Sequence, residues 1–335
     1  MLYFVFGRAG SGKTTFLRNL IKDFVGSSDE IPILIVPEQY SFESERELLR
    51  ILGPDKINRV ENLSFSRLAH KVVSKYKKIK KPFITDAERS VIMSMCLNEL
   101  SDTLEIYGKH TNSTEVLEQL INADIQMRQS CVLPQELSTA SENTKNFILK
   151  QKMREIALIS ESYRAQISAK YEDESGELDE LAHLIAENNL FEDRVIMLDS
   201  FRGFTRQEMK VFVELLKRAK AVYISICAND FSDAAEGFGA FTHTTEFAKK
   251  LRALAKENDV RIAKCAYLSS AAKFNNFPPG QTKPVRETIS ALEPSLYSPQ
   301  FEGYSKETGD IVLVSARDKA DESEFVAREI RRLTR

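Results

Sequence analysis

The sequence has no long apolar run and no excess of charge of one sign. No stretch reaches the roughly 18 consecutive apolar residues that suggest a membrane span. The apolar opening Leu2–Phe6 gives way to Gly7 before a secretory signal could form. The 335 residues include 47 basic and 49 acidic side chains, for a net charge of -2. We therefore expect no membrane segment, and we expect any nucleic-acid site to be a local basic track.

Cysteine and histidine are few and widely spaced. The four cysteines form no CxxC pair, and the four histidines show no metal-ligand spacing. This pattern predicts reduced thiols in a cytosolic protein and disfavours a zinc or iron–sulfur site within these residues. The chain stops at Arg335 inside a helical pattern without an end signal, so we expect a fragment of a longer protein.

Apolar periodicity predicts an α/β fold interrupted by a long helical stretch. The opening reads strand, loop, helix, strand, which is typical of a parallel sheet. From residue 82 to 189 the pattern is helical throughout, and the capping box Thr85–Glu88 opens it. A second capping box, Thr205–Glu208, starts a later helix. Expected strands are residues 2–6, 31–36, 57–60, 195–198, 221–227, 261–268 and 311–314. Expected helices are residues 14–25, 41–52, 64–76, 85–100, 114–130, 144–171, 178–188, 205–216, 245–255 and 324–333.

A glycine-rich loop follows the first strand and carries the clearest chemical signal. Residues 7–14 match G-x-x-x-x-G-K-[ST] in full, between a predicted strand and a predicted helix. Backbone N–H groups of such a loop converge on phosphate oxygens, and the helix N-terminus adds its positive dipole. Lys13 is expected to reach the β- and γ-phosphates of ATP, and the Thr14 hydroxyl to ligate Mg²⁺. The nucleotide-binding candidates are Gly7, Arg8, Ala9, Gly10, Ser11, Gly12, Lys13, Thr14 and Thr15.

A second anchor for Mg²⁺ is expected at the end of another strand. Asp199 directly follows the apolar run Val195–Leu198, as the metal-binding aspartate of a P-loop ATPase does. The next residue, which is a water-polarising glutamate in many such enzymes, is Ser200, and serine is a poor base at neutral pH. We therefore name no catalytic residue and expect slow or no ATP hydrolysis.

Four motifs in order resemble those of AddB, the family of B subunits of bacterial AddAB ATP-dependent helicase–nucleases. They are residues 4–15, residues 34–42 (LIVPEQYSF), residues 63–69 (LSFSRLA) and residues 199–208 (DSFRGFTRQE). The match covers the α/β parts of the chain, whereas the helical region matches only in texture. Four ordered motifs are far more specific than the glycine-rich loop alone.

The resemblance implies a UvrD-like helicase architecture. Residues 1–78 and 190–308 would form a first RecA-like domain, residues 79–189 its inserted helical subdomain, and residues 309–335 the start of a second RecA-like domain. The family's nuclease domain and its iron–sulfur cluster would lie in a C-terminal region absent from this chain. The resemblance thus implies ATP and Mg²⁺ as cofactors and no nuclease activity in this part.

The resemblance also implies that this chain binds nucleotide and DNA but does not itself drive DNA unwinding. The expected partners are an AddA-like helicase–nuclease subunit, which drives unwinding, and single-stranded DNA at broken ends. The resemblance implies that the chain recognises a Chi hotspot in this DNA during double-strand-break repair. The expected location is the bacterial cytoplasm. In helicases of this type, the segments after the second and third strands line the DNA track. The corresponding DNA-binding candidates are Gln39, Ser41, Phe65, Arg67, His70 and Phe204.

Several alternatives stay open on the sequence. Each phenylalanine could be a core residue, Arg67 a surface salt-bridge partner, His70 a plain helix-face residue, and the basic run Lys75–Lys81 a solvated face. The chain could also be a P-loop kinase of a small molecule or nucleoside, although it shows no arginine-rich lid motif. A third possibility is a structural module whose loop binds nothing.

Overall fold

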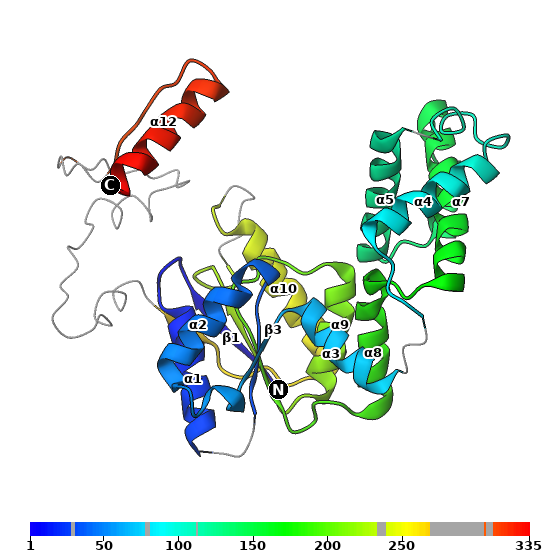
Figure 1. Ribbon diagram of the computed structural model, residues 1–335. Helices are drawn as coiled ribbons and strands as arrows, with labels where there is room; N and C mark the ends of the chain where they lie inside the picture. The colour runs from blue at the N-terminus through cyan, green and yellow to red at the C-terminus, as the bar shows by residue number, and fades with distance from the viewer. Residues whose placement is uncertain (28–30, 78–80, 112, 233–238, 269–304, 306–310) are drawn as a thin grey trace. The chain divides into compact units, whose positions relative to one another are not determined.

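The parallel sheet predicted from the opening pattern is present. The computed structural model describes residues 1–27, 31–77, 81–111, 113–232, 239–268, 305 and 311–335. Within them the six strands run in the order β3-β2-β4-β5-β1-β6, and every neighbouring pair is parallel. The strands are β1 (Leu2–Gly7), β2 (Ile33–Ile35), β3 (Glu61–Leu63), β4 (Val195–Leu198), β5 (Ala221–Ile226) and β6 (Ala266–Leu268). All carboxyl ends therefore meet at one edge of the sheet (Figure 1).

Helices cover both faces of this sheet, as its continuous apolar strands require. On one face, α1 (Lys13–Ser27) and α2 (Ser41–Leu52) pack against Val5, Leu34 and Met197. On the other face lie α3 (Phe65–Tyr76), α8 (Glu177–Asn188), α9 (Arg206–Arg218) and α10 (Thr242–Glu257). Short 3₁₀ helices are η1 (Glu38–Tyr40), η2 (Ile57–Arg59) and η3 (Glu174–Gly176).

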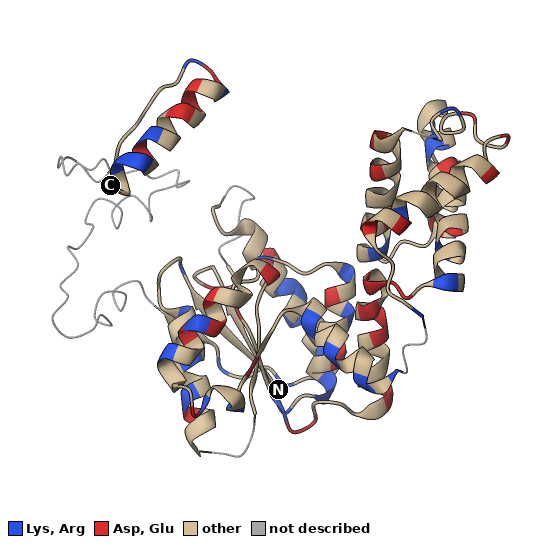
Figure 2. Cartoon of the chain, viewed as in Figure 1, with Lys and Arg blue, Asp and Glu red and all other residues tan. Residues whose placement is uncertain are grey.

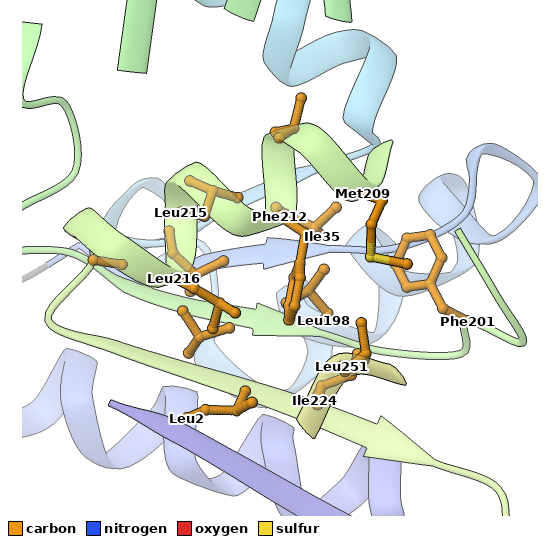
Figure 3. Close-up of a cluster of buried hydrophobic side chains, with 14 of the residues drawn as sticks. Leu2, Ile35, Leu198, Phe201, Met209, Phe212, Leu215, Leu216, Ile224 and Leu251 are labelled. Atoms are coloured by element: carbon orange, nitrogen blue, oxygen red, sulfur yellow. The ribbon is translucent and has the colours of Figure 1, made fainter. Parts of the chain in front are cut away.

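The larger core lies under α9. Figure 3 shows Phe212 from this helix beside Ile35 and Leu198 of the sheet, and all three are fully buried. The stripe Met209, Phe212, Leu215 and Leu216 in the helix has the i, i+3, i+4 spacing of an amphipathic helix. Thr205 caps this helix and forms the predicted capping box with Glu208.

The predicted helical insert has a core of its own. It contains α4 (Asp86–Glu99), α5 (Thr114–Gln129), α6 (Pro134–Glu142) and α7 (Phe147–Lys170). Met93, Cys96 and Tyr163 are among its fully buried side chains. The short helix α6, which begins with a proline in its first turn, was not among the predicted helices. Helix α8, by contrast, packs its buried face into the α/β core between α3 and α9.

Three predicted strands differ from the structure. Of the predicted strand 57–60, Ile57–Arg59 form the 3₁₀ helix η2 instead. The strand is the more polar Glu61–Leu63, because β3 pairs on one side only and needs no fully apolar run. Of the predicted strand 261–268, only Ala266–Leu268 pairs continuously, with one isolated bridge at Ile262. The predicted strand 311–314 is wrong, since none of the strand pairings found among the described residues involves it.

Residues 311–335 belong to a second compact unit. Its described helix is α12 (Lys319–Leu333), whose N-cap Asp318 accepts hydrogen bonds from the N–H groups of Ala320 and Asp321. Across the described ranges, no helix is both long and apolar enough to cross a membrane. The four cysteines are free thiols, and Cys96 is buried.

Replacing Thr85 by Ala is expected to destabilise the insert by about 1 kcal/mol, the usual contribution of an N-cap side chain. Thr85 Oγ1 accepts the Glu88 N–H, while the Glu88 carboxylate accepts the Thr85 N–H at 2.8 Å. That backbone bond lowers the pKa of Glu88. The carboxylate's contribution is therefore present above its ordinary pKa and is lost as pH falls through the lowered one.

Urea unfolding of Thr85→Ala, followed by far-UV circular dichroism at pH 7 and at pH 3, measures this effect. Thr139→Ala is the matched control, because Thr139 is an exposed helical threonine that caps nothing. An equal effect of the two substitutions at pH 7 would contradict the capping role.

Candidate functional site

The loop between β1 and α1 has a backbone that only glycine adopts without strain. Gly10 and Gly12 have φ values of +70° and +91°. A Cβ on Gly7 would lie 2.1 Å from Ser11 Oγ and 2.9 Å from the carbonyl oxygen of Leu268. Glycine is therefore needed at Gly7 because a Cβ has no space there, and at Gly10 and Gly12 because their backbone is left-handed.

The Ser11 hydroxyl of this loop is a hydrogen-bond donor that is not used within the described part of the chain. Ser11 Oγ is buried and has no hydrogen-bond partner among the residues that the structure describes. The loop runs directly into α1, whose first N–H groups have no intrahelical acceptor. Buried polar groups are normally paired, so the Ser11 hydroxyl beside the N-terminus of α1 fits an anion such as a phosphate.

Lys13 is folded back over the loop. Its Nζ donates to the carbonyl oxygens of Gly7 at 2.6 Å and Arg8 at 2.9 Å. Thr14 and Thr15 lie in the first turn of α1, with Thr14 half-buried and Thr15 exposed. The Arg8 guanidinium lies 5.0 Å from the ring centroid of Phe241. A flexible ammonium held by loop carbonyls can exchange these bonds for stronger ones to a phosphate.

The position of the loop in the sheet is also typical of a ligand site. The chain leaves β1 toward β2 on one side, while β6 lies on the other side of β1. The carboxyl end of β1 is therefore a topological switch point, where open parallel sheets bind their ligands.

Asp199 follows β4 at the same edge of the sheet. It is buried, with 4% exposure, and its Oδ1 accepts a hydrogen bond from Ser225 Oγ at 2.5 Å. Ser200 has φ +65°, a conformation that costs a non-glycine residue about 1–3 kcal/mol and that clusters at functional sites. A buried carboxylate can serve as a Mg²⁺ ligand beside phosphates. The described part of the chain contains no cluster of three His, Cys, Asp or Glu residues that could bind a metal by themselves.

The predicted DNA contact Phe65 lies inside the α/β core. It is 3% exposed, and its ring packs edge-on against Phe201 and Phe204 at centroid distances of 5.5 and 5.4 Å. Phe204 is half-buried and packs edge-on against Phe247 at 4.8 Å. This packing favours the core role that the sequence left open for both rings over base stacking.

Ser41 and Arg67 are brought together after β2 and β3. Arg67 Nη1 donates to Ser41 Oγ at 2.9 Å, and Asn62 Nδ2 donates to the Ser41 carbonyl at 3.0 Å. Arg67 is exposed and makes no ion pair with any described carboxylate, so the salt-bridge alternative finds no support there. Gln39 lies exposed in η1, just before this network.

His70 lines a groove of about 570 Å³ together with Arg67, Thr205 and Gln207. Its Nδ1 lies 3.2 Å from Glu177 Oε1, and burial raises the pKa of Glu177. His70 therefore has a protein partner in this groove.

Lysines of the basic run Lys75–Lys81 contact different protein groups. Lys77 Nζ lies 3.9 Å from Glu180, and Lys81 Nζ donates to the Ser168 carbonyl at 2.5 Å. Residues 78–80 lie outside the described ranges. Figure 2 shows Lys and Arg interspersed with Asp and Glu over the helices. The described part of the basic run therefore forms no patch of one sign.

Two exposed aromatic side chains next to Gln39 and Ser41 were missed at the level of sequence. Tyr40 is 42% exposed and Phe42 is 78% exposed. The buried stripe of α2 is Ser41, Ser44, Leu48 and Leu52. Phe42 lies off this i, i+3, i+4 stripe, so helical periodicity could have identified it as a surface ring.

Two exposed arginines were missed as well. Arg202 and Arg206 follow β4, and neither makes an ion pair with a described side chain. They add two cations at the edge of the sheet that Arg67 also occupies. Exposed rings with unpaired arginines are the chemistry that binds single-stranded nucleic acid.

Comparison with known proteins places this chain beside one group. The family described as "ADDB, N-terminal" matches residues 4–279. The B subunit of the ATP-dependent helicase/deoxyribonuclease of Acetivibrio thermocellus is 30% identical over 100% of the chain and 29% of its own length. Proteins of the same name from Thermoanaerobacter sp. and Clostridium tetani are 30% and 28% identical, over 28% and 29% of their lengths. The chain therefore spans less than a third of the curated relatives that it matches.

Proposed function

The chain belongs to the family of AddB N-terminal regions, and on this premise we propose that it is the nucleotide- and DNA-binding, non-motor part of a helicase–nuclease B subunit. The observation that supports nucleotide binding best is the glycine loop with its buried Ser11 hydroxyl, which has no partner in the described chain, at the start of α1. The proposed domains are a first RecA-like domain (1–78 and 190–308), a helical insert predicted at 79–189 and the start of a second such domain (309–335). Helix α8 (Glu177–Asn188), at the end of the predicted insert, packs into the α/β core and corrects that boundary.

In the proposed nucleotide site, the protein mainly binds and orients. Lys13 and the loop N–H groups would bind the phosphates, and Thr14 and Asp199 would hold Mg²⁺, which would neutralise phosphate charge. Ser200 offers no carboxylate to polarise a water molecule, so hydrolysis is slow or absent. The AddA-like partner subunit supplies the motor.

In the proposed DNA site, exposed rings stack on bases and arginines contact phosphates. Tyr40 and Phe42 offer the stacking surface, whereas Phe65 and Phe204 pack against each other in the α/β core. Gln39 and Arg67 lie beside them, and Ser41 holds the Arg67 guanidinium. The ligand is single-stranded DNA at a broken end, including a Chi hotspot sequence.

Replacing Phe42 by Ala is expected to weaken binding of a labelled single-stranded oligonucleotide about tenfold, because one base stack contributes about 1–3 kcal/mol. Fluorescence anisotropy across a salt series, with and without ATP·Mg²⁺, measures this. Phe147→Ala is the matched control, since Phe147 is 74% exposed on α7 of the insert. Equal affinities of the Phe42→Ala and Phe147→Ala proteins would reject stacking on Phe42. Absence of any salt-dependent binding to the unmodified chain would reject the DNA site.

A P-loop kinase is the second candidate, because the glycine loop and Asp199 would serve it equally well. A screen of phosphate acceptors with labelled ATP separates the two functions. Transfer of label to a small molecule or nucleoside would favour the kinase, whereas binding without transfer favours the helicase-like role.

A further inference from the structure

Ser225 occupies the strand between the two halves of the proposed nucleotide site. It lies on β5, which pairs with β1 on one side and with β4 on the other. The register places Ser225 opposite Val5 of β1, and Ile224 opposite Leu198, the residue before Asp199. Ser225 therefore lies level with Asp199, one strand closer to the glycine loop.

Side-chain alternation places Ser225 on the face that α1 covers. Its neighbours Ile224 and Ile226 are buried in the core under α9 and α10. Val5 and Met197 point to the opposite face, which packs against α1. Because side chains alternate along a strand, Ser225 shares the face of Val5, and Asp199 that of Met197. Helix α1, which begins at Lys13, contacts both β1 and β5.

Both hydrogen-bonding functions of the Ser225 hydroxyl are used at this point. It donates to Asp199 Oδ1 at 2.5 Å and accepts the Ser200 N–H at 3.2 Å. Ser225 and Asp199 are 2% and 4% exposed, so water does not compete strongly for these bonds. Oδ2 of Asp199 accepts no hydrogen bond from another described residue, which leaves this oxygen for a ligand.

We infer that Ser225 is a positioning residue that orients the Asp199 carboxylate toward Mg²⁺ at the phosphates of the bound nucleotide. This inference rests on the proposed nucleotide site. The single hydroxyl fixes the carboxylate through Oδ1 and the backbone after it through the Ser200 N–H. Outer partners of this kind orient a metal ligand without touching the metal.

The test is the gain in nucleotide affinity that Mg²⁺ produces. A fluorescent ATP analogue is titrated into the chain with Mg²⁺ in excess over nucleotide and, separately, with EDTA, and the ratio of the two Kd values is the readout. In Ser225→Ala this ratio is expected to fall about 10- to 100-fold, as for other outer-shell partners of metal ligands, while the Kd in EDTA stays unchanged. A general loss of structure would weaken both Kd values together.

Two further variants keep the test informative if Ser225→Ala unfolds. Ser225→Thr retains the hydroxyl and is expected to keep the Mg²⁺ effect, whereas Ser225→Cys offers only a weak S–H donor and is expected to lose most of it. Equal Mg²⁺ ratios in the unmodified chain and in folded Ser225→Cys or Ser225→Ala would overturn the role of Ser225 alone. An unmodified chain that binds no nucleotide would overturn the proposed site and this inference together.

Discussion

Replacing Lys13 by Ala is expected to abolish the thermal stabilisation that ATP·Mg²⁺ gives to the unmodified chain. A ligand that binds only the folded state at 100 times its Kd stabilises by about 2.7 kcal/mol. Lys13 carries the one ammonium in the glycine loop, and its Nζ already reaches the carbonyl oxygens of Gly7 and Arg8. Without it, the phosphates lose their charge-assisted bond, and at the same nucleotide concentration the stabilisation should vanish.

Thermal unfolding with and without ATP·Mg²⁺ measures this effect, and Lys22→Ala is the matched control. Lys22 is an exposed lysine on the same helix, two turns after the loop. It should keep the full stabilisation. If ATP·Mg²⁺ shifts the unfolding midpoint equally in Lys13→Ala and Lys22→Ala, the nucleotide binds away from the glycine loop or binds non-specifically.

Replacing Glu155 by Ala should be the most damaging of the substitutions for the stability of the insert, at about 3 kcal/mol. Its buried carboxylate accepts the N–H groups of Glu105, Ile106 and Tyr107 at 2.9–3.1 Å and the side chain of Gln151 at 3.0 Å. The substitution leaves three backbone donors without their acceptor, and each costs about 1–3 kcal/mol when it stays buried. Local hydration keeps the total below the sum.

Urea unfolding followed by far-UV circular dichroism tests this, because helices dominate the insert. The control is Glu161→Ala on the same helix, where an exposed carboxylate accepts one bond from Gln135. Its effect is expected within about 0.5 kcal/mol, as at most surface positions. Similar losses for both variants would show that the loop after α4 does not depend on Glu155.

Local signals were strong enough to predict much of the fold. The capping boxes at Thr85 and Thr205 begin α4 and α9 as predicted, because a cap is made within four residues. The run Val195–Leu198 is strand β4 with the predicted bounds. Pairing, in contrast, depends on distant residues. The apolar run at 311–314 finds no strand partner in the described chain, and the polar β3 is a strand only because β2 lies beside it.

In the candidate site, too, the features set by neighbouring residues could be predicted, and those set by distant residues could not. The glycine pattern, Lys13 and Asp199 follow from local chemistry, and the structure places the loop and Asp199 at one edge of the sheet. The role of Ser225 could not be seen, because a serine inside an apolar run gives no sign of which carboxylate it meets across the sheet. Phe65 shares the buried stripe of Leu68, Ala69 and Val72, so here helical spacing was informative and pointed to the core.

Isothermal titration calorimetry of ATP·Mg²⁺ into the chain tests the nucleotide site most directly. Loop, lysine and carboxylate together predict saturable binding at one site per chain, with discrete binding heats and no sustained heat of hydrolysis. The Lys13→Ala protein should give only the heat of dilution. Dilution heat alone from the unmodified chain, or a continuous heat of rapid turnover, would contradict a nucleotide-binding, non-motor role.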